Sequence, residues 1–198
     1  MLRVVFYQVL DPGTADPAGW AVAIGERAAA RSWRTEPMWL ATDDARGLFE
    51  MEYLRHVRLE ADREVVGAGF VRPGGDETDA LAALFILVEL TREFQGRAEW
   101  RDDGNPIRKQ RWLVLNRGEP AGRQSLDELM VARPVQKRLP GGTITFYPPR
   151  YRGATLPGPS GPPGSWSFSL EGLRAEAGSF LEAEAEAMRM YRSLSAIV

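Results

Sequence analysis

The chain has no cysteine and a single histidine, His56, among its 198 residues. Without cysteine it cannot form disulfides, thiolate metal sites or a thiol nucleophile. A Ser-His-Asp triad or a histidine-rich metal centre would depend on His56 alone. The chemistry left to this sequence is therefore that of carboxylates, arginines, hydroxyls and the backbone.

Long apolar stretches are also missing. The most apolar run covers only residues 80–88, whereas a membrane-spanning helix needs about 18 or more such residues. The amino terminus carries one early arginine, Arg3, and lacks an apolar helix followed by a small-residue cleavage site. We therefore expect a cytoplasmic protein that does not enter a membrane.

Lysine is scarce. All but Lys109 and Lys137 of the 25 basic residues are arginines, and this bias, with abundant Ala, Gly and Pro, favours a high-GC bacterial coding sequence. The hydrophobic and charged shares, 44% and 26%, are those of ordinary globular proteins, and the length suffices for one substantial domain.

The small net charge of −2 conceals an uneven distribution of charge. Residues 1–96 carry a net −6, residues 97–152 a net +6 and residues 153–198 a net −2. Opposed blocks of this kind can neutralise one another within a fold or can attract an anionic partner. Both interpretations stay open at this stage.

Apolar periodicity predicts the secondary structure. We expect strands at 2–10, 48–62, 64–71, 98–101, 111–116 and 143–147, and helices at 17–32, 77–95, 125–132 and 170–198. Asp16 and Asp76 precede two of these helices as natural N-caps. The helix at 77–95 is apolar on nearly all sides, so we expect it to be the central buried helix.

Clustered strands, rather than a strict alternation of strand and helix, favour an α+β fold. We predict a single domain with a mostly antiparallel sheet, packed by about three helices. Residues 1–152 would form the core, and residues 153–165, rich in proline and glycine, a connector. Residues 166–198 would form a C-terminal helix that packs on the core or on a partner. Glu184 interrupts the apolar stripe of this helix.

The expected strand at 48–62 carries the candidate acid–base groups. His56 lies among charged residues on its polar parity, as is typical of an exposed or salt-bridged histidine. The neighbouring carboxylates could form an acid–base pair or bind a hard metal ion, but such alternation is also typical of a solvated strand face. We predict no catalytic residue, metal or cofactor here, because no specific ligand spacing accompanies these carboxylates, which are Glu50, Glu52, Glu60, Asp62 and Glu64.

Basic and aromatic residues gather in the middle of the chain. Cations interleaved with aromatic rings can bind phosphates and stack bases. The chain as a whole is acidic and shows no familiar nucleic-acid-binding signature, so an acidic protein surface, including this chain's own amino-terminal segment, is the favoured counterpart. The cluster comprises Arg108, Lys109, Arg111, Arg133, Lys137, Arg138, Arg150 and Arg152 with Trp112, Tyr147 and Tyr151.

The leading functional hypothesis is a non-enzymatic bacterial protein-binding module, for example an immunity or regulatory protein that occludes a toxin or enzyme. It rests on the missing catalytic motifs, the opposed charge blocks and the apolar stripe of the C-terminal helix. The alternatives are a carboxylate-dependent, metal-assisted hydrolase or phosphoesterase, and a nucleic-acid-binding protein that uses residues 97–152. The predicted partner-binding residues are Phe180, Tyr191, Leu194, Arg108, Lys109, Arg111, Tyr147 and Tyr151.

Overall fold

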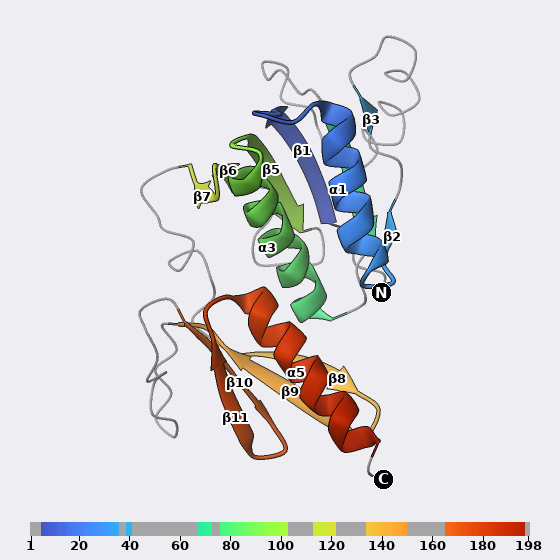
Figure 1. Ribbon diagram of the computed structural model, residues 1–198, viewed down its shortest axis with the longest axis vertical. Helices are drawn as coiled ribbons and strands as arrows, with labels where there is room; N and C mark the ends of the chain where they lie inside the picture. Colours follow the sequence, from blue (N-terminus) through green and yellow to red (C-terminus); the bar gives the residue numbers. More distant parts are fainter. Residues whose placement is uncertain are drawn as a thin grey trace. The chain divides into compact units, whose positions relative to one another are not determined.

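The computed structural model describes residues 5–35, 39–40, 67–72, 76–102, 113–121, 134–149 and 165–196 (Figure 1). Its helices are α1 (Pro17–Ala29), α3 (Glu77–Glu93) and α5 (Phe180–Ser195). Its strands are β1 (Val5–Asp11), β2 (Arg34–Thr35), β3 (Trp39–Leu40), β4 (Gly67–Arg72), β5 (Arg97–Asp102), β6 (Leu113–Asn116), β7 (Glu119–Pro120), β8 (Val135–Leu139), β9 (Gly142–Tyr147), β10 (Trp166–Leu170) and β11 (Leu173–Ala177).

The chain divides into two compact units. The first unit comprises Met1–Gly75 and Ile86–Ala121, and the second comprises Asp76–Phe85 and Gly122–Val198. Each unit has its own antiparallel sheet, so the predicted α+β fold with antiparallel pairing, three helices and a C-terminal helix is confirmed. The prediction of one sheet did not anticipate this division into two.

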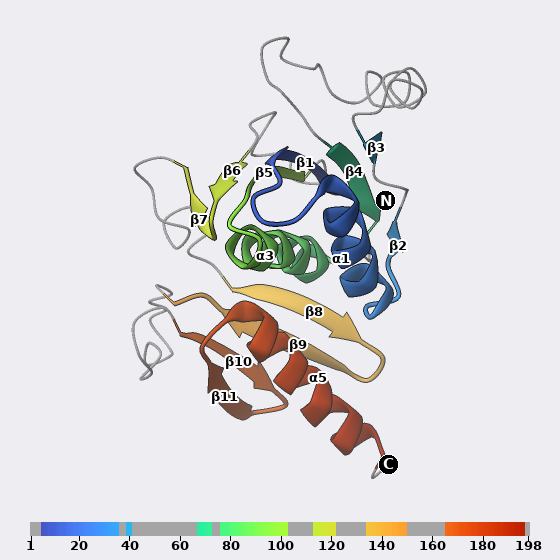
Figure 2. The same cartoon turned by 45° about the horizontal axis from the view of Figure 1, so that its top comes forward.

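In the first unit, β1 lies at the centre of a seven-stranded sheet in the order β2-β4-β1-β5-β6-β7, with β3 also paired to β4. Alternate residues of β1, namely Val5, Tyr7 and Val9, are almost completely buried. Helix α1 and the C-terminal half of α3 lie against the same face of this sheet (Figure 2). The expected strands at 2–10, 98–101 and 111–116 thus correspond to β1, β5 and β6.

Helix α1 begins where the sequence predicts. The Asp16 side chain accepts a hydrogen bond from Gly19 N at 2.6 Å, and Pro17 occupies the first helical position. Trp20, which is fully buried, donates from Nε1 to Pro12 O at 3.0 Å and packs edge-on against Phe94. These contacts attach α1 to the residues that directly follow β1 and α3, namely Pro12 and Phe94.

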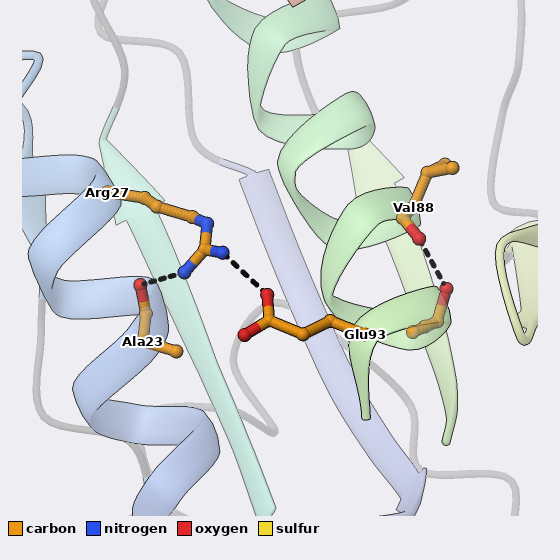
Figure 3. Close-up of polar contacts among 5 residues, drawn as sticks. Ala23, Arg27, Val88 and Glu93 are labelled. Atoms are coloured by element: carbon orange, nitrogen blue, oxygen red, sulfur yellow. Dashed lines mark hydrogen bonds and ion pairs between the residues drawn. The ribbon is translucent and has the colours of Figure 1, made fainter. Parts of the chain in front are cut away.

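An ion pair between exposed side chains adds a second link between α1 and α3 (Figure 3). Arg27 donates to Glu93 Oε2 at 2.8 Å and reaches back to Ala23 O at 3.5 Å. Because both partners are substantially exposed, this pair stabilises the fold by only about 0–1 kcal/mol. Burial of the apolar face of α1 is the larger contribution.

Helix α3 contributes to both units, since residues up to Phe85 belong to the second unit and residues from Ile86 onward to the first. Its side chains are buried on nearly all sides, as the sequence predicts for a central helix. The buried set is Thr78, Asp79, Ala80, Ala82, Ala83, Leu84, Ile86, Leu87, Val88, Leu90 and Thr91.

In the second unit, four strands form an antiparallel sheet in the order β11-β10-β9-β8. One face of this sheet is apolar and carries Phe146 of β9 and Phe168 of β10, both fully buried. Phe180 of α5 packs edge-on against Phe146, and it stacks with Phe85 of α3 at a centroid separation of 5.5 Å. This aromatic cluster is the core of the second unit.

The prediction that residues 166–198 form one helix is wrong in its first half. Residues 166–177 form the hairpin β10-β11, and the helix begins at Phe180. Apolar and polar residues alternate along Trp166–Leu170, which is the strand period. Ser179 is the N-cap of α5, because its hydroxyl accepts a hydrogen bond from Glu182 N at 3.2 Å.

Several predicted elements lie outside the described residues. These are the strand at 48–62, the short helix at 125–132 and residues 153–164 of the connector. The described part of 64–71 is β4, which pairs antiparallel with β1. The strand expected at 143–147 corresponds to β9.

Candidate functional site

The predicted partner-binding residues fall into three groups. Phe180 is fully buried among aromatic rings, so the prediction that it meets a partner is wrong: the apolar stripe of α5 packs on its own sheet. Tyr191 and Leu194 lie half-buried on the last turns of α5. Tyr147 lies half-buried on β9. The remaining predicted residues, Arg108, Lys109, Arg111 and Tyr151, lie outside the described residues.

Tyr191 has a partner within the chain. Its hydroxyl donates a hydrogen bond to Pro140 O at 2.6 Å, in the turn that joins β8 to β9. The end of α5 is thereby tied to its own sheet, and the Tyr191 ring leaves only part of its surface to solvent.

Tyr147 belongs to a polar face of the second-unit sheet, which we call the open face. Every side chain on it is exposed or half-buried, in contrast with the buried apolar face beneath α5. The open face comprises Gln136, Arg138, Thr143, Thr145, Tyr147, Ser167, Ser169, Arg174 and Glu176.

Strand register arranges the open face in rows. Thr145 lies opposite Ser169 on β10, and Ser169 lies opposite Arg174 on β11. Tyr147 and Ser169 approach each other diagonally, with their hydroxyl oxygens 3.4 Å apart. Because hydroxyls both donate and accept, these rows present adaptable hydrogen-bonding groups between arginines at the two edges of the sheet.

Lys137 lies on the opposite face of β8 and is mostly buried. Its ammonium donates to Asp79 Oδ1 at 2.8 Å and to Glu184 Oε1 at 3.1 Å. The side chains of the three residues are 15%, 10% and 3% exposed, respectively. Burial lowers the pKa of Lys137, but the hydrogen bonds and charges of the two carboxylates outweigh it, so that the pKa is raised above the ordinary lysine value. The raised pKa keeps Lys137 protonated, so it acts as a cation and not as a nucleophile.

Lys137 belongs to the basic cluster, for which an acidic partner and the chain's own acidic segments both stayed open as counterparts. The structure pairs it with carboxylates from the two acidic segments of its own chain, Asp79 and Glu184. For this residue, the opposed charge blocks neutralise each other within the fold. Thr78, next to Asp79 on α3, has a buried hydroxyl without a hydrogen-bond partner among the described residues.

A second buried polar pair lies in the first unit. Gln8 of β1 and Glu99 of β5 are register partners on neighbouring strands, and they are 4% and 1% exposed. Both side chains have interactions within the chain. Tyr7, on the other face of β1, is buried, and this burial raises the pKa of its phenol, which therefore stays neutral.

The described residues hold no group of three or more His, Cys, Asp or Glu side chains placed to bind a metal ion. His56 and the carboxylates from Glu50 to Glu64 lie outside them. Within the same described ranges, no helix has the length and apolar character required to cross a membrane.

Comparison with known proteins finds no matching family model, curated protein or solved structure. The function must therefore be inferred from the structure of the chain itself. Two features described above bear on it, the buried Lys137 cluster and the open face. Of these two, the open face is the one whose described side chains are exposed or half-buried.

Proposed function

We propose that this chain is a bacterial, cytoplasmic protein-binding module that recognises its partner through the open face. The observation that carries the proposal is the contrast between the two faces of one sheet. Helix α5 covers the apolar face, whereas the open face keeps Tyr147 and two arginines at its surface.

The chemistry of the open face suits a protein partner. Tyrosine and arginine are enriched in protein interfaces, because each supplies a large contact area together with directional hydrogen bonds. Serine and threonine hydroxyls supply hydrogen bonds that adapt to the partner. Arg138 and Arg174 outnumber Glu176, so a partner with carboxylates at matching positions would be electrostatically complementary.

The finer proposal is an immunity or regulatory role, in which the bound partner is a toxin or enzyme whose working surface is occluded. The hydrogen-bonded sheet supports this role, since a face that is already ordered loses little conformational entropy on binding. Arginines at the edges of the face would also speed association with an acidic partner.

Site-specific photocrosslinking in the native cells tests the proposal. A photoreactive residue replaces Thr143, which is exposed on the open face, and in a matched strain it replaces Val22, which is 60% exposed on α1. We expect a discrete protein adduct from position 143 and none from position 22.

A charge-reversal pair makes the test specific. Arg138→Glu should abolish the adduct, whereas Arg192→Glu, an equal charge change on exposed α5, should leave it intact. The proposal is overturned if the adduct is insensitive to Arg138→Glu, if position 143 yields no adduct, or if the adduct contains nucleic acid. The last outcome would support nucleic-acid binding instead.

A further inference from the structure

The outer edge of β11 has a feature that the open face does not explain. Among the described strands, β11 pairs only with β10 and therefore ends the sheet. Leu173, at the start of β11, is 47% exposed, and in the described part of the chain Val22 is the other large apolar side chain that is exposed. An edge strand presents backbone donors and acceptors that can pair with another strand.

The hairpin geometry determines which backbone groups face outward. Glu171 and Gly172 form the two-residue turn between β10 and β11, and both have positive φ, 48° and 84°, as in a type I′ turn. In such a hairpin the flanking residues, Leu170 and Leu173, form a hydrogen-bonded pair. Hydrogen bonding then alternates, so that the backbone groups of Arg174 and Glu176 point away from β10.

A second copy of β11 can pair with this edge in only a few registers. The outward groups of one copy must meet the outward groups of the other, which allows Arg174 opposite Arg174, Glu176 opposite Glu176, or Arg174 opposite Glu176. The first two place like charges directly across from each other, which is destabilising. The third register forms two opposite-charge pairs, because Arg174 of each copy faces Glu176 of the other. A two-fold axis at Ala175 relates the two pairs.

We propose that two copies of this chain associate by antiparallel pairing of their β11 edges in this register. The interface is isologous, since the same strand serves both copies. It would join the two four-stranded sheets into one and place Leu173 of each copy beside Ala177 of the other. Charged side chains on an edge strand commonly prevent such pairing, but here the order Leu-Arg-Ala-Glu-Ala makes them self-complementary.

The side chains at this edge are compatible with the arrangement. Arg174 and Glu176 are both exposed, so that pairing them costs little desolvation. Glu176 also has an interaction within its own chain, and a carboxylate has enough acceptor positions to serve more than one donor. Because the charges are exposed, the association should weaken as salt concentration rises.

Sedimentation velocity on charge-reversed variants tests the register. Arg174→Glu alone sets Glu against Glu, and Glu176→Arg alone sets Arg against Arg, so each variant should remain monomeric at concentrations where the unaltered chain dimerises. Mixing the two variants restores both opposite-charge pairs, and the dimer should return as a heterodimer. Thermal unfolding of each variant checks that it is folded.

Disulfide trapping tests the two-fold axis. The chain has no cysteine of its own, so Ala175→Cys introduces a single thiol whose only possible partner is a second copy. In the proposed register, the two Cα atoms form a non-hydrogen-bonded pair about 4.5 Å apart, within disulfide reach. We expect rapid covalent dimers from Ala175→Cys and not from Val22→Cys.

Three results would overturn the proposal. They are an unaltered chain that stays monomeric up to millimolar concentration, single charge reversals that leave dimerisation unchanged, and a mixture of the two reversed variants that remains monomeric. Arg174 and Glu176 also lie on the open face, but the open face is tested through Thr143 and Arg138, which lie on β9 and β8 and not on β11.

Discussion

Lys137 and Asp79, 58 residues apart in the sequence, are joined by a hydrogen bond of 2.8 Å. The same ammonium reaches Glu184, so that one cation on β8 links the first turn of α3 to the second turn of α5. Two carboxylates share one ammonium in a mostly buried setting. Removing the cation would therefore leave like charges next to each other with little water to screen them.

Lys137→Met should lower the free energy of unfolding substantially. Breaking a buried ion pair by deleting one partner costs about 3–5 kcal/mol, because the remaining charge is uncompensated. Urea denaturation measures the loss. The matched control is the triple variant Lys137→Met, Asp79→Asn, Glu184→Gln, which carries no charge at the site and should recover much of the stability. Equal stabilities for the single and triple variants would contradict this account.

The same cluster predicts a dependence of stability on alkaline pH. The folded-state pKa of Lys137 lies above its ordinary value of 10.5, so the folded protein holds this proton more tightly than the unfolded chain. Its contribution is fully present below pH 10.5 and declines as pH rises through the folded-state pKa. The stability difference between the unaltered chain and Lys137→Met should therefore shrink in this range. A constant difference would show that the pKa is not raised.

Phe180 should be a stability residue and not a binding residue. It packs against Phe85, Phe146 and Trp166, and Phe180→Ala should cost about 3–5 kcal/mol through lost burial and the cavity that remains. Tyr191→Phe removes only the hydrogen bond to Pro140 O and should cost about 0.5–1.5 kcal/mol. Denaturation midpoints compare the two variants. A milder effect from Phe180→Ala than from Tyr191→Phe would contradict the described packing.

Local patterns in the sequence were sufficient for much of the fold. Asp16 before Pro17 located the start of α1, and the apolar run after Asp76 located α3 as a buried helix. The hairpin β10-β11 was missed although its signals are present. Trp166–Leu170 alternates with period two, and Ser179 with Glu182 matches a capping box. Leu173 and Ala177 of β11 happen to continue the helical spacing of the apolar residues in α5, and this spacing favoured a single long helix.

The candidate sites depended on contacts that sequence separation hides. A glutamate within an apolar stripe, as at Glu184, indicates that a buried partner is needed. The neighbouring sequence does not identify Lys137 as that partner, because Lys137 lies 47 residues away. Tyr147 was singled out for its aromatic and basic neighbours. Its place on the open face depends on which side of the sheet α5 covers, and strand period alone leaves that choice undetermined.

Gly13 should tolerate substitution less well than Gly141. It has a positive φ of 64°, and a Cβ at this position would collide with Phe94 O, the acceptor for Thr14 N. Gly141 in the β8–β9 turn also has a positive φ, 82°, but a Cβ there would meet nothing within 4 Å. Alanine at either position must adopt the left-handed conformation, which lowers the free energy of unfolding by about 1–2 kcal/mol. Gly13→Ala must in addition displace backbone, so its loss in the free energy of unfolding should exceed that of Gly141→Ala by a margin that urea titration resolves. Equal losses would contradict this account. They would mean that the turn before α1 moves away from Phe94 at no cost, although the hydrogen bond from Trp20 Nε1 to Pro12 O holds the same turn.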